Sequence, residues 1–260
     1  MDPAASTSTV TALYSKRAVE SGEPLSRDNP SPLVHVVAAA VIDATGRVLI
    51  AQRPAGTHLA GGWEFPGGKL EPGEERLAGL ARELREELGI TVATPRPLIR
   101  VRHIYPSREV LLDMWVVTRY SGEPRGLDGQ ALRWCTQDEL AVTELLPADK
   151  PIVAALRLPE RLTQVSTRYY SIRDFSSIGN PAVGTEIFHE TRLFGVICVN
   201  AEDGVAAEAA GADFLIMRDA LPVRVLAALC DSLPVPVFAS GIGLEQAWAL
   251  GASGLNEIRA

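Results

Sequence analysis

Residues 63–90 read WEFPGGKLEPGEERLAGLARELREELGI, and this stretch decides the fold of the first half of the chain. Over residues 74–88 its apolar side chains recur at i, i+3, i+4, i+7 and i+11, which predicts an amphipathic helix. Gly89 then provides a signal for the end of that helix. The expected buried stripe consists of Leu77, Leu80, Ala81, Leu84 and Leu88.

The opposite side of this helix carries carboxylates. With about 100° between successive residues, Glu83, Glu86 and Glu87 fall within one arc facing away from the leucine stripe. Like-charged neighbours cost about a few tenths of a kcal/mol per pair, and pairing of Arg82 with Glu86 offsets only part of this. A hard divalent cation such as Mg²⁺ is the natural remaining counter-charge. The alternative to a metal site is a charged helix surface exposed to solvent, which is the usual interpretation of a Glu-Glu pair taken alone.

A glycine turn precedes the helix. Gly67 and Gly68 let backbone carbonyls approach a metal ion closely and permit a sharp reversal from strand to helix. Five residues separate Gly68 from Glu74, and seven separate Glu74 from Arg-Glu-Leu at 82–84. One residue then precedes Glu-Glu at 86–87, and one more precedes Gly-Ile at 89–90. Every position matches the box GX5EX7REUXEEXGU, with U a large apolar residue, and average residue usage gives such agreement at about 10⁻⁹ per start site. The sequence therefore resembles the Nudix hydrolases.

This resemblance extends over about residues 34–158 and looks closest to the MutT-type nucleoside triphosphate pyrophosphohydrolases. It implies a Nudix domain over residues 33–158, an α/β/α sandwich with a mixed sheet, and metal-assisted cleavage of a diphosphate bond. Outside the box it rests on segments 49–53, 63–71, 122–124 and 129–130 and on Trp134.

The resemblance also implies roles for individual residues. Gly67 would supply a backbone carbonyl to the metal, and Asp128, where the family usually has Glu, would add an acidic ligand from the loop before the last strand. Glu83 or a neighbouring carboxylate would be the base that prepares the attacking water. The implied metal ligands are Gly67, Glu83, Glu86, Glu87 and Asp128, and the implied catalytic residues are Arg82, Glu83, Glu86 and Glu87.

Substrate contacts follow by the same resemblance. Arg53 and Lys69 would face phosphate, and His58, Phe65 and Arg108 would line the nucleotide pocket. The alternatives are a surface position for Arg53 and simple packing for His58 and Phe65.

Asp149 stands where the bacterial branch tends to carry an Asn that reads an oxidised guanine. A carboxylate there accepts hydrogen bonds from guanine N–H groups but donates to an oxygen only when protonated. The alternative is that Asp149 caps the helix that follows it.

Alternating patterns and turn residues predict the other elements of this domain. Strands at 35–42 and 47–53 should form one hairpin, and strands at 98–105 and 109–118 a second. A short strand at 131–135 and a helix at 151–158, opened by Pro151, complete it.

After Pro159 the pattern changes to apolar strands about 20 residues apart, which is the spacing of βα units in a parallel sheet. Loops are expected at 173–177 and 180–184. The predicted strands are 195–199, 212–216, 235–239 and 254–258.

Segments 209–214, 233–243 and 251–254 resemble the C-terminal units of thiamine phosphate synthase-like barrels. A complete (β/α)₈ barrel takes about 200 residues or more, so we expect a truncated, partial (β/α) barrel-like domain over residues 163–260, without catalysis of its own. Its open sheet edges would need cover from the Nudix domain or from a second subunit, that is, a homodimer.

Composition limits the partners. The 260 residues include 25 Lys and Arg and 32 Asp and Glu, a net charge of −7, which argues against a nucleic-acid-coating surface. No apolar run approaches the ~18 residues that span a bilayer, and three widely spaced cysteines favour a reducing cytoplasm. Residues 1–32 lack an apolar segment after Lys16 and Arg17 and are expected to form a flexible tail.

Together these features predict a cytoplasmic hydrolase of nucleoside triphosphates that uses Mg²⁺, with Mn²⁺ as the alternative. The leading substrate is 8-oxo-dGTP, cleaved to 8-oxo-dGMP and pyrophosphate. Another pyrophosphate, either thiamine-related or a nucleotide sugar, is the second hypothesis. The third is a regulatory protein that binds a ligand through its C-terminal domain.

Overall fold

The structure is a computed structural model that describes residues 33–258 except 55, 57, 58, 106, 107, 165–169 and 175–192. The predicted tail, His58 and the loop at 180–184 lie outside these residues. The chain divides into two compact units, within Pro32–Val153 and Ala154–Ala260, and the division falls inside α4 (Lys150–Arg157). Within the described parts, no helix has the length and apolar character needed to cross a membrane.

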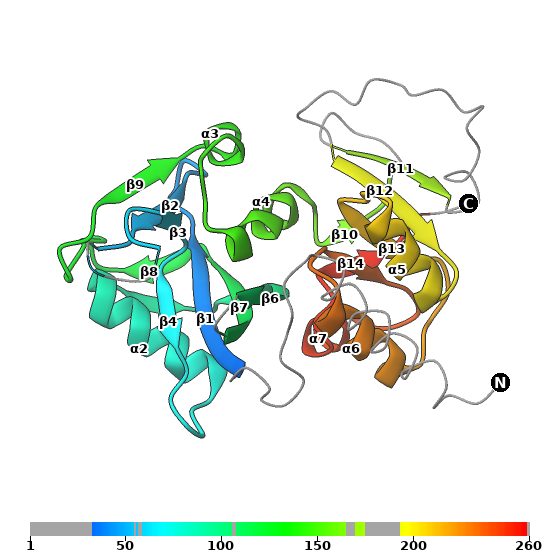
Figure 1. Cartoon of the computed structure of the whole chain (residues 1–260), viewed down its shortest axis with the longest axis horizontal. Coiled ribbons are helices and arrows are strands. Elements are labelled where there is room, and N and C mark those ends of the chain that lie inside the picture. The colour runs from blue at the N-terminus through cyan, green and yellow to red at the C-terminus, as the bar shows by residue number, and fades with distance from the viewer. Residues whose placement is uncertain are drawn as a thin grey trace. The chain divides into compact units, whose positions relative to one another are not determined.

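The main sheet of the first unit is mixed, as predicted. In its described part the strand order is β4-β1-β7-β6, with β1 and β7 parallel and the other pairs antiparallel (Figure 1). The pairing of β6 with β7 confirms the predicted hairpin at 98–105 and 109–118. The strands are β1 (Leu33–Val41), β4 (Gly67–Lys69), β6 (Arg96–Tyr105) and β7 (Arg108–Val117).

The hairpin predicted from 35–42 and 47–53 is wrong beyond its turn. An isolated bridge joins Ile42 to Val48, and the second strand then pairs in another sheet, of order β3-β2-β9. Strand β7 pairs along one edge of β1, and β4 pairs with Val36–Ala38 on the other, so β4 takes part of the edge that the hairpin with β2 would need. Strand β9 is the predicted strand at 131–135. These strands are β2 (Val48–Gln52), β3 (Trp63–Glu64) and β9 (Leu132–Cys135).

Smaller elements complete the first unit. Strands β5 (Thr91–Ala93) and β8 (Arg119–Ser121) pair antiparallel. Helix α3 (Gln137–Ala141) begins with a capping box, and the 3₁₀ turn η1 (Pro147–Asp149) runs into α4, the helix predicted at 151–158.

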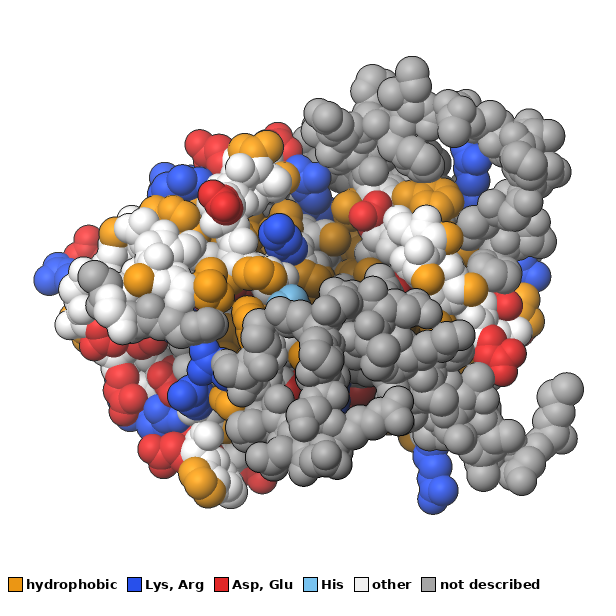
Figure 2. Space-filling model, in the orientation of Figure 1, with side chains coloured by type: hydrophobic (Ala, Val, Ile, Leu, Met, Phe, Trp, Pro, Cys, Tyr) orange, Lys and Arg blue, Asp and Glu red, His pale blue; other side chains and the backbone are white. Residues whose placement is uncertain are grey.

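Helix α2 (Arg76–Leu88) is the predicted carboxylate helix, and Gly89 ends it in the left-handed conformation. Leu80, Leu84 and Leu88 are fully buried against one face of β1 and β7. Leu77 is 49% exposed, so its predicted burial is wrong: it lies in the first turn, before the first buried residue of the helix. Figure 2 shows acidic and basic side chains together where Figure 1 places α2.

The described part of the second unit contains a parallel sheet of order β10-β15-β14-β13-β12-β11. All four predicted strands are present, and β11 through β15 lie side by side in chain order, as successive βα units require. The strands are β10 (Arg161–Leu162), β11 (Tyr170–Asp174), β12 (Leu193–Cys198), β13 (Phe214–Met217), β14 (Val237–Ala239) and β15 (Gly254–Asn256).

Alternation along β13 divides the core of this unit between the two faces of the sheet. Leu215 and Met217 pack with the helices, whereas Phe214 and Ile216 face an aromatic cluster that includes Tyr170 and Phe238. Burial on both faces explains the continuous apolar runs of these strands. The helices are α5 (Ala201–Ala209), α6 (Val223–Ser232) and α7 (Leu244–Ala249).

The predicted loop at 173–177 is wrong for its first two residues. Arg173 and Asp174 belong to β11, which pairs with β12. Their polar side chains do not suggest a buried strand, but β11 is an edge strand, where charged residues are well tolerated. Residues 175–177 lie outside the described residues.

The contrast between two leucines of α2 tests this packing. Leu84→Ala should lower the free energy of unfolding by about 2–5 kcal/mol, because it leaves a cavity under a fully buried position. Leu77→Ala is the matched control and should cost less than about 1 kcal/mol. Urea unfolding measures both, and equal losses would contradict the packing described.

Candidate functional site

A cleft of about 510 Å³ opens on the face of β1 and β7 that α2 does not cover. Successive strand residues point to opposite faces, so Val36 and Ala38 line the cleft while Val37 and Ala39 lie in the core under α2. Residues 64–69 form another wall, running from the end of β3 through β4. The position of the cleft therefore follows from the alternation along β1.

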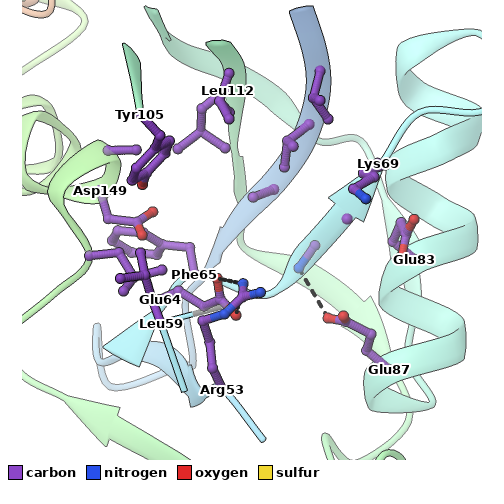
Figure 3. A pocket seen from close by; sticks show the side chains of 18 of the residues that line it. Arg53, Leu59, Glu64, Phe65, Lys69, Glu83, Glu87, Tyr105, Leu112 and Asp149 are labelled. Carbon is purple, nitrogen blue, oxygen red and sulfur yellow. Dashed lines mark hydrogen bonds and ion pairs between the residues drawn. The ribbon is translucent and has the colours of Figure 1, made fainter. Parts of the chain in front are cut away.

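The cleft has two chemically different ends (Figure 3). Glu83, Glu87 and Lys69 lie at one end, and Asp149 and Tyr105 at the other. The predicted site residues that line it are Arg53, Phe65, Gly67, Lys69, Glu83, Glu87, Arg108, Asp128 and Asp149. Arg82 and Glu86 do not line it, and His58 lies outside the described residues.

Two glycines allow the acidic end to form. Gly67 has a φ of 148°, and a Cβ atom there would collide with the backbone of β1 at Val37 and Ala38. A Cβ atom on Gly68 would collide with the carboxylate of Glu83. Glycine is needed at both positions for the turn to lie this close to β1 and α2.

Arg82 connects the carboxylates on the outer side of the turn. Its Nε and Nη2 donate to the two oxygens of Glu74, each at 2.8 Å, and its Nη1 donates to Glu83 Oε1 at 2.9 Å. It also donates to Glu86 Oε2 at 3.3 Å, the pairing expected from the sequence, and to the Lys69 carbonyl at 3.1 Å. The hydrogen bonds from Arg82 and from the Glu71 backbone lower the pKa of Glu74 to about 2. Arg82 therefore holds other side chains and does not face the cleft.

Glu87 carries the uncompensated charge of the site. The Gly67 N–H donates to its Oε2 at 3.1 Å, yet burial, together with the nearby Glu83, Glu64 and Asp128, raises the pKa of Glu87 to about 7. Closely spaced carboxylates of this kind are stabilised by a cation.

The donor set suits a hard cation, since it offers carboxylate and backbone carbonyl oxygens. Within the described residues, however, no three His, Cys, Asp or Glu side chains are already grouped as ligands around one point. Glu83 and Glu86 point to Arg82, and Glu86 is the more exposed, at 56% of its side chain. Binding of an ion would thus require these carboxylates to turn.

The other end of the cleft contains a buried acid. Asp149 is 4% exposed, and burial, then the charge of Glu64, raises its pKa well above the usual value, although the Phe65 N–H donates to it. Asp149 is the last residue of η1 and directly precedes Lys150, where α4 begins. Its side chain lines the cleft, and the helix-capping alternative stays a prediction.

The sequence reasoning missed Glu64 and Tyr105. Arg53 Nη1 donates to both oxygens of Glu64, at 2.9 and 2.7 Å, while burial raises the pKa of Glu64. Burial and the charge of Asp149 also raise the pKa of Tyr105. Glu64 precedes the glycine turn and could have been noticed as a further carboxylate near it. No local sequence signal marks Tyr105, which lies at the end of β6.

Comparison with known proteins identifies the family. The model of the NUDIX domain matches residues 37–155. The chain is 41% identical over 119 residues to CTP pyrophosphohydrolase of Escherichia coli, covering 46% of this chain and 88% of that protein. It is 33% identical over 124 residues to 8-oxo-dGTP diphosphatase of E. coli, covering 48% of this chain and 96% of that protein. The chain belongs to the Nudix family and is a hydrolase, and the matched part is about half of its length.

The chain is also similar to other proteins. Putative 8-oxo-dGTP diphosphatase 2 of Mycobacterium tuberculosis is 43% identical over 122 residues, covering 46% of this chain and 86% of that protein. Among proteins of solved structure, the E. coli ORF135 protein is 39% identical in sequence, with a TM-score of 0.44, and the match covers 51% of this chain and 91% of that one. Nudix hydrolases generally use divalent metal ions.

The contact at Gly68 gives a test of the acidic end. Gly68→Ala should displace the Glu83 carboxylate and weaken Mn²⁺ binding by about tenfold or more, because a misplaced ligand loses its bond to the ion. Electron paramagnetic resonance of free Mn²⁺ measures the affinity. Gly243→Ala, where an added Cβ meets no atom within 4 Å, is the control. Unchanged Mn²⁺ affinity in folded Gly68→Ala protein would remove Glu83 from the cation site.

Proposed function

We propose that this chain is a Mg²⁺-dependent nucleoside triphosphate pyrophosphohydrolase that removes oxidised nucleotides, converting 8-oxo-dGTP to 8-oxo-dGMP and pyrophosphate. The observation that carries the proposal is one cleft with Glu83, Glu87 and Asp128 among its lining residues and the buried Asp149 at the end away from Glu83 and Glu87. The names of the relatives support it, and their match lies on this unit. We place the enzyme in the cytoplasm, where unpaired cysteines are normal.

Four carboxylates and one carbonyl would hold the cation. Glu83 and Glu87 already face the cleft with Asp128, and Glu86 would turn from its long hydrogen bond with Arg82 to join them. Gly67 adds its carbonyl oxygen. A bound divalent cation would neutralise phosphate charge and lower the pKa of a water molecule. Mn²⁺ would substitute for Mg²⁺, since both accept oxygen ligands.

The protein residues then prepare one displacement at phosphorus. Glu83 or a neighbouring carboxylate takes the proton of the attacking water, whose oxygen bonds to phosphorus. The bond from that phosphorus to the oxygen that bridges the α- and β-phosphates breaks, and the leaving group departs with the electron pair, so the products are the nucleoside monophosphate and pyrophosphate. Lys69 and Arg53 would face the phosphates, with Glu64 holding one nitrogen of Arg53. Arg82 acts as a positioning residue, because its bonds orient Glu74 and Glu83.

The base would lie at the other end of the cleft. An ionised Asp149 can accept the two adjacent N–H groups of a guanine edge, and Phe65, Tyr105 and Arg108 line the space around it. One of the relatives above, 41% identical to this chain, acts on CTP by its name, so a cytosine nucleotide is the second candidate. The pairing edge of cytosine offers one amino donor beside an acceptor, and this arrangement suits a protonated Asp149.

The second unit leaves two broader alternatives. Its parallel sheet, with β11 through β15 in chain order and an aromatic cluster on one face, supports a truncated partial barrel over residues 163–260, which follows the Nudix sandwich over 33–158 in the chain. The thiamine phosphate synthase-like segments keep a thiamine-related pyrophosphate, a nucleotide sugar, or a regulatory ligand as competing hypotheses. A homodimer would cover the edge strands β10 and β11.

Carboxylate variants test the proposed function. Glu83→Gln, Glu86→Gln and Glu87→Gln should each lower turnover of 8-oxo-dGTP with Mg²⁺ by orders of magnitude and leave the fold intact, because an amide binds the cation weakly. Glu75→Gln, at the start of α2 and without a side-chain capping bond, is the control. Pyrophosphate release measures the rate, with CTP, dNTPs, nucleotide sugars and thiamine-type pyrophosphates run in parallel. Absence of turnover for every substrate would favour the regulatory hypothesis.

The raised pKa of Asp149 predicts that base recognition depends on pH. Its raised pKa means that the ionised acceptor forms only as the pH rises above the ordinary carboxyl range, so kcat/KM for 8-oxo-dGTP should rise with pH there. Glu64, Arg53 and Tyr105 are the charged or titratable groups around it. Asp149→Asn should abolish this rise and lower kcat/KM by about tenfold or more, the usual effect of losing hydrogen bonds to a charged group.

Asp219 is an exposed residue of the second unit, and Asp219→Asn is the control for this measurement. A pH profile that Asp149→Asn leaves unchanged would contradict the role of Asp149.

A further inference from the structure

The loop between β8 and β9 is attached to the C-terminal end of α2. The Arg125 N–H donates to the Leu88 carbonyl at 3.1 Å, and the Leu127 N–H donates to the Glu87 carbonyl at 2.9 Å. Carbonyls in the last turn of a helix have no partner within the helix, so these bonds satisfy groups that would otherwise need water. The loop that carries Asp128 is thereby placed next to the helix that carries Glu87.

One side chain links the two acidic residues. Gln130 Oε1 accepts from the Asp128 N–H at 2.9 Å, and Gln130 Nε2 donates to the Glu87 carbonyl at 3.2 Å. Glu87 and Asp128 are 41 residues apart in sequence, yet both line the same cleft. The Gln130 carboxamide therefore contacts the backbone of both.

This contact opposes an electrostatic repulsion. Asp128 and Glu87 both line the cleft, and two carboxylates that lie close to each other repel when both are ionised. Asp128 is exposed and precedes Gly129. A link between the backbones keeps Asp128 near Glu87 despite that repulsion.

We propose that Gln130 is a positioning residue that holds Asp128 beside Glu87 and so sets the affinity of the cation site. This inference rests on the proposed function, in which both acids bind the cation. Among these three side chains of similar length, the amide both donates and accepts, whereas ionised Glu only accepts and Met is no more than a weak acceptor. Groups that hold metal ligands commonly contribute about 10–100-fold to metal affinity.

The test uses the full chain freed of metal and Mn²⁺ as the probe. Gln130→Glu and Gln130→Met should each weaken Mn²⁺ binding by about tenfold or more, measured by electron paramagnetic resonance without substrate. Gln246→Glu, an exposed residue of α7, should leave it unchanged. Thermal unfolding without metal should show the same midpoint in all variants. Mn²⁺ affinity that is normal in both Gln130 variants overturns the inference.

A double-mutant cycle separates positioning from general structural damage. In the Asp128→Ala background, Gln130→Met should have no further effect on Mn²⁺ affinity, because the group that Gln130 holds is gone. Losses that simply add would overturn the inference. Failure of the proposed function gives a different result: Glu83→Gln protein would then bind Mn²⁺ and turn over nucleotides as the wild type does.

Discussion

The crowding of negative charge between the glycine turn and α2 is the constraint on which the rest of the site depends. Arg82 resolves part of it by donating to Glu74, Glu83 and Glu86 at once. Glu87 lies beyond the reach of those bonds, and its pKa rises to about 7 in consequence of burial and of its neighbours. A fold that places carboxylates so close, and compensates them only in part, is prepared for a cation.

The same strand supports both the core and the cleft. One side of β1 packs under α2, and the other side, with β7, forms the cleft wall. Because α2 rests on the core side, its carboxylates can reach the cleft only where the turn passes from one layer to the other. Gly67 and Gly68 permit that passage, since any larger residue would meet β1 or Glu83.

Much of the fold could be predicted because its signals are local. The period of α2, the breaks at Pro66 and Gly89, and the regular spacing of strands after Pro159 depend on neighbours in sequence. The failed hairpin shows where such signals end. The turn at residues 43–46 joins β1 and β2 as expected, but β4 and β7 compete for the edges of β1, and that competition involves residues far along the chain.

The sequence by itself determined that Arg82, Glu83, Glu86 and Glu87 lie within two turns of one helix, because helical periodicity and fixed spacing bring them together. Only the tertiary structure decided the other half. Asp149 reads equally well as a helix cap or as a cleft residue, and only the fold brings its carboxylate into the cleft, where the Phe65 N–H donates to it. Tyr105, Glu64 and Gln130 acquire neighbours from strands and loops distant in sequence, and no local pattern encodes such contacts.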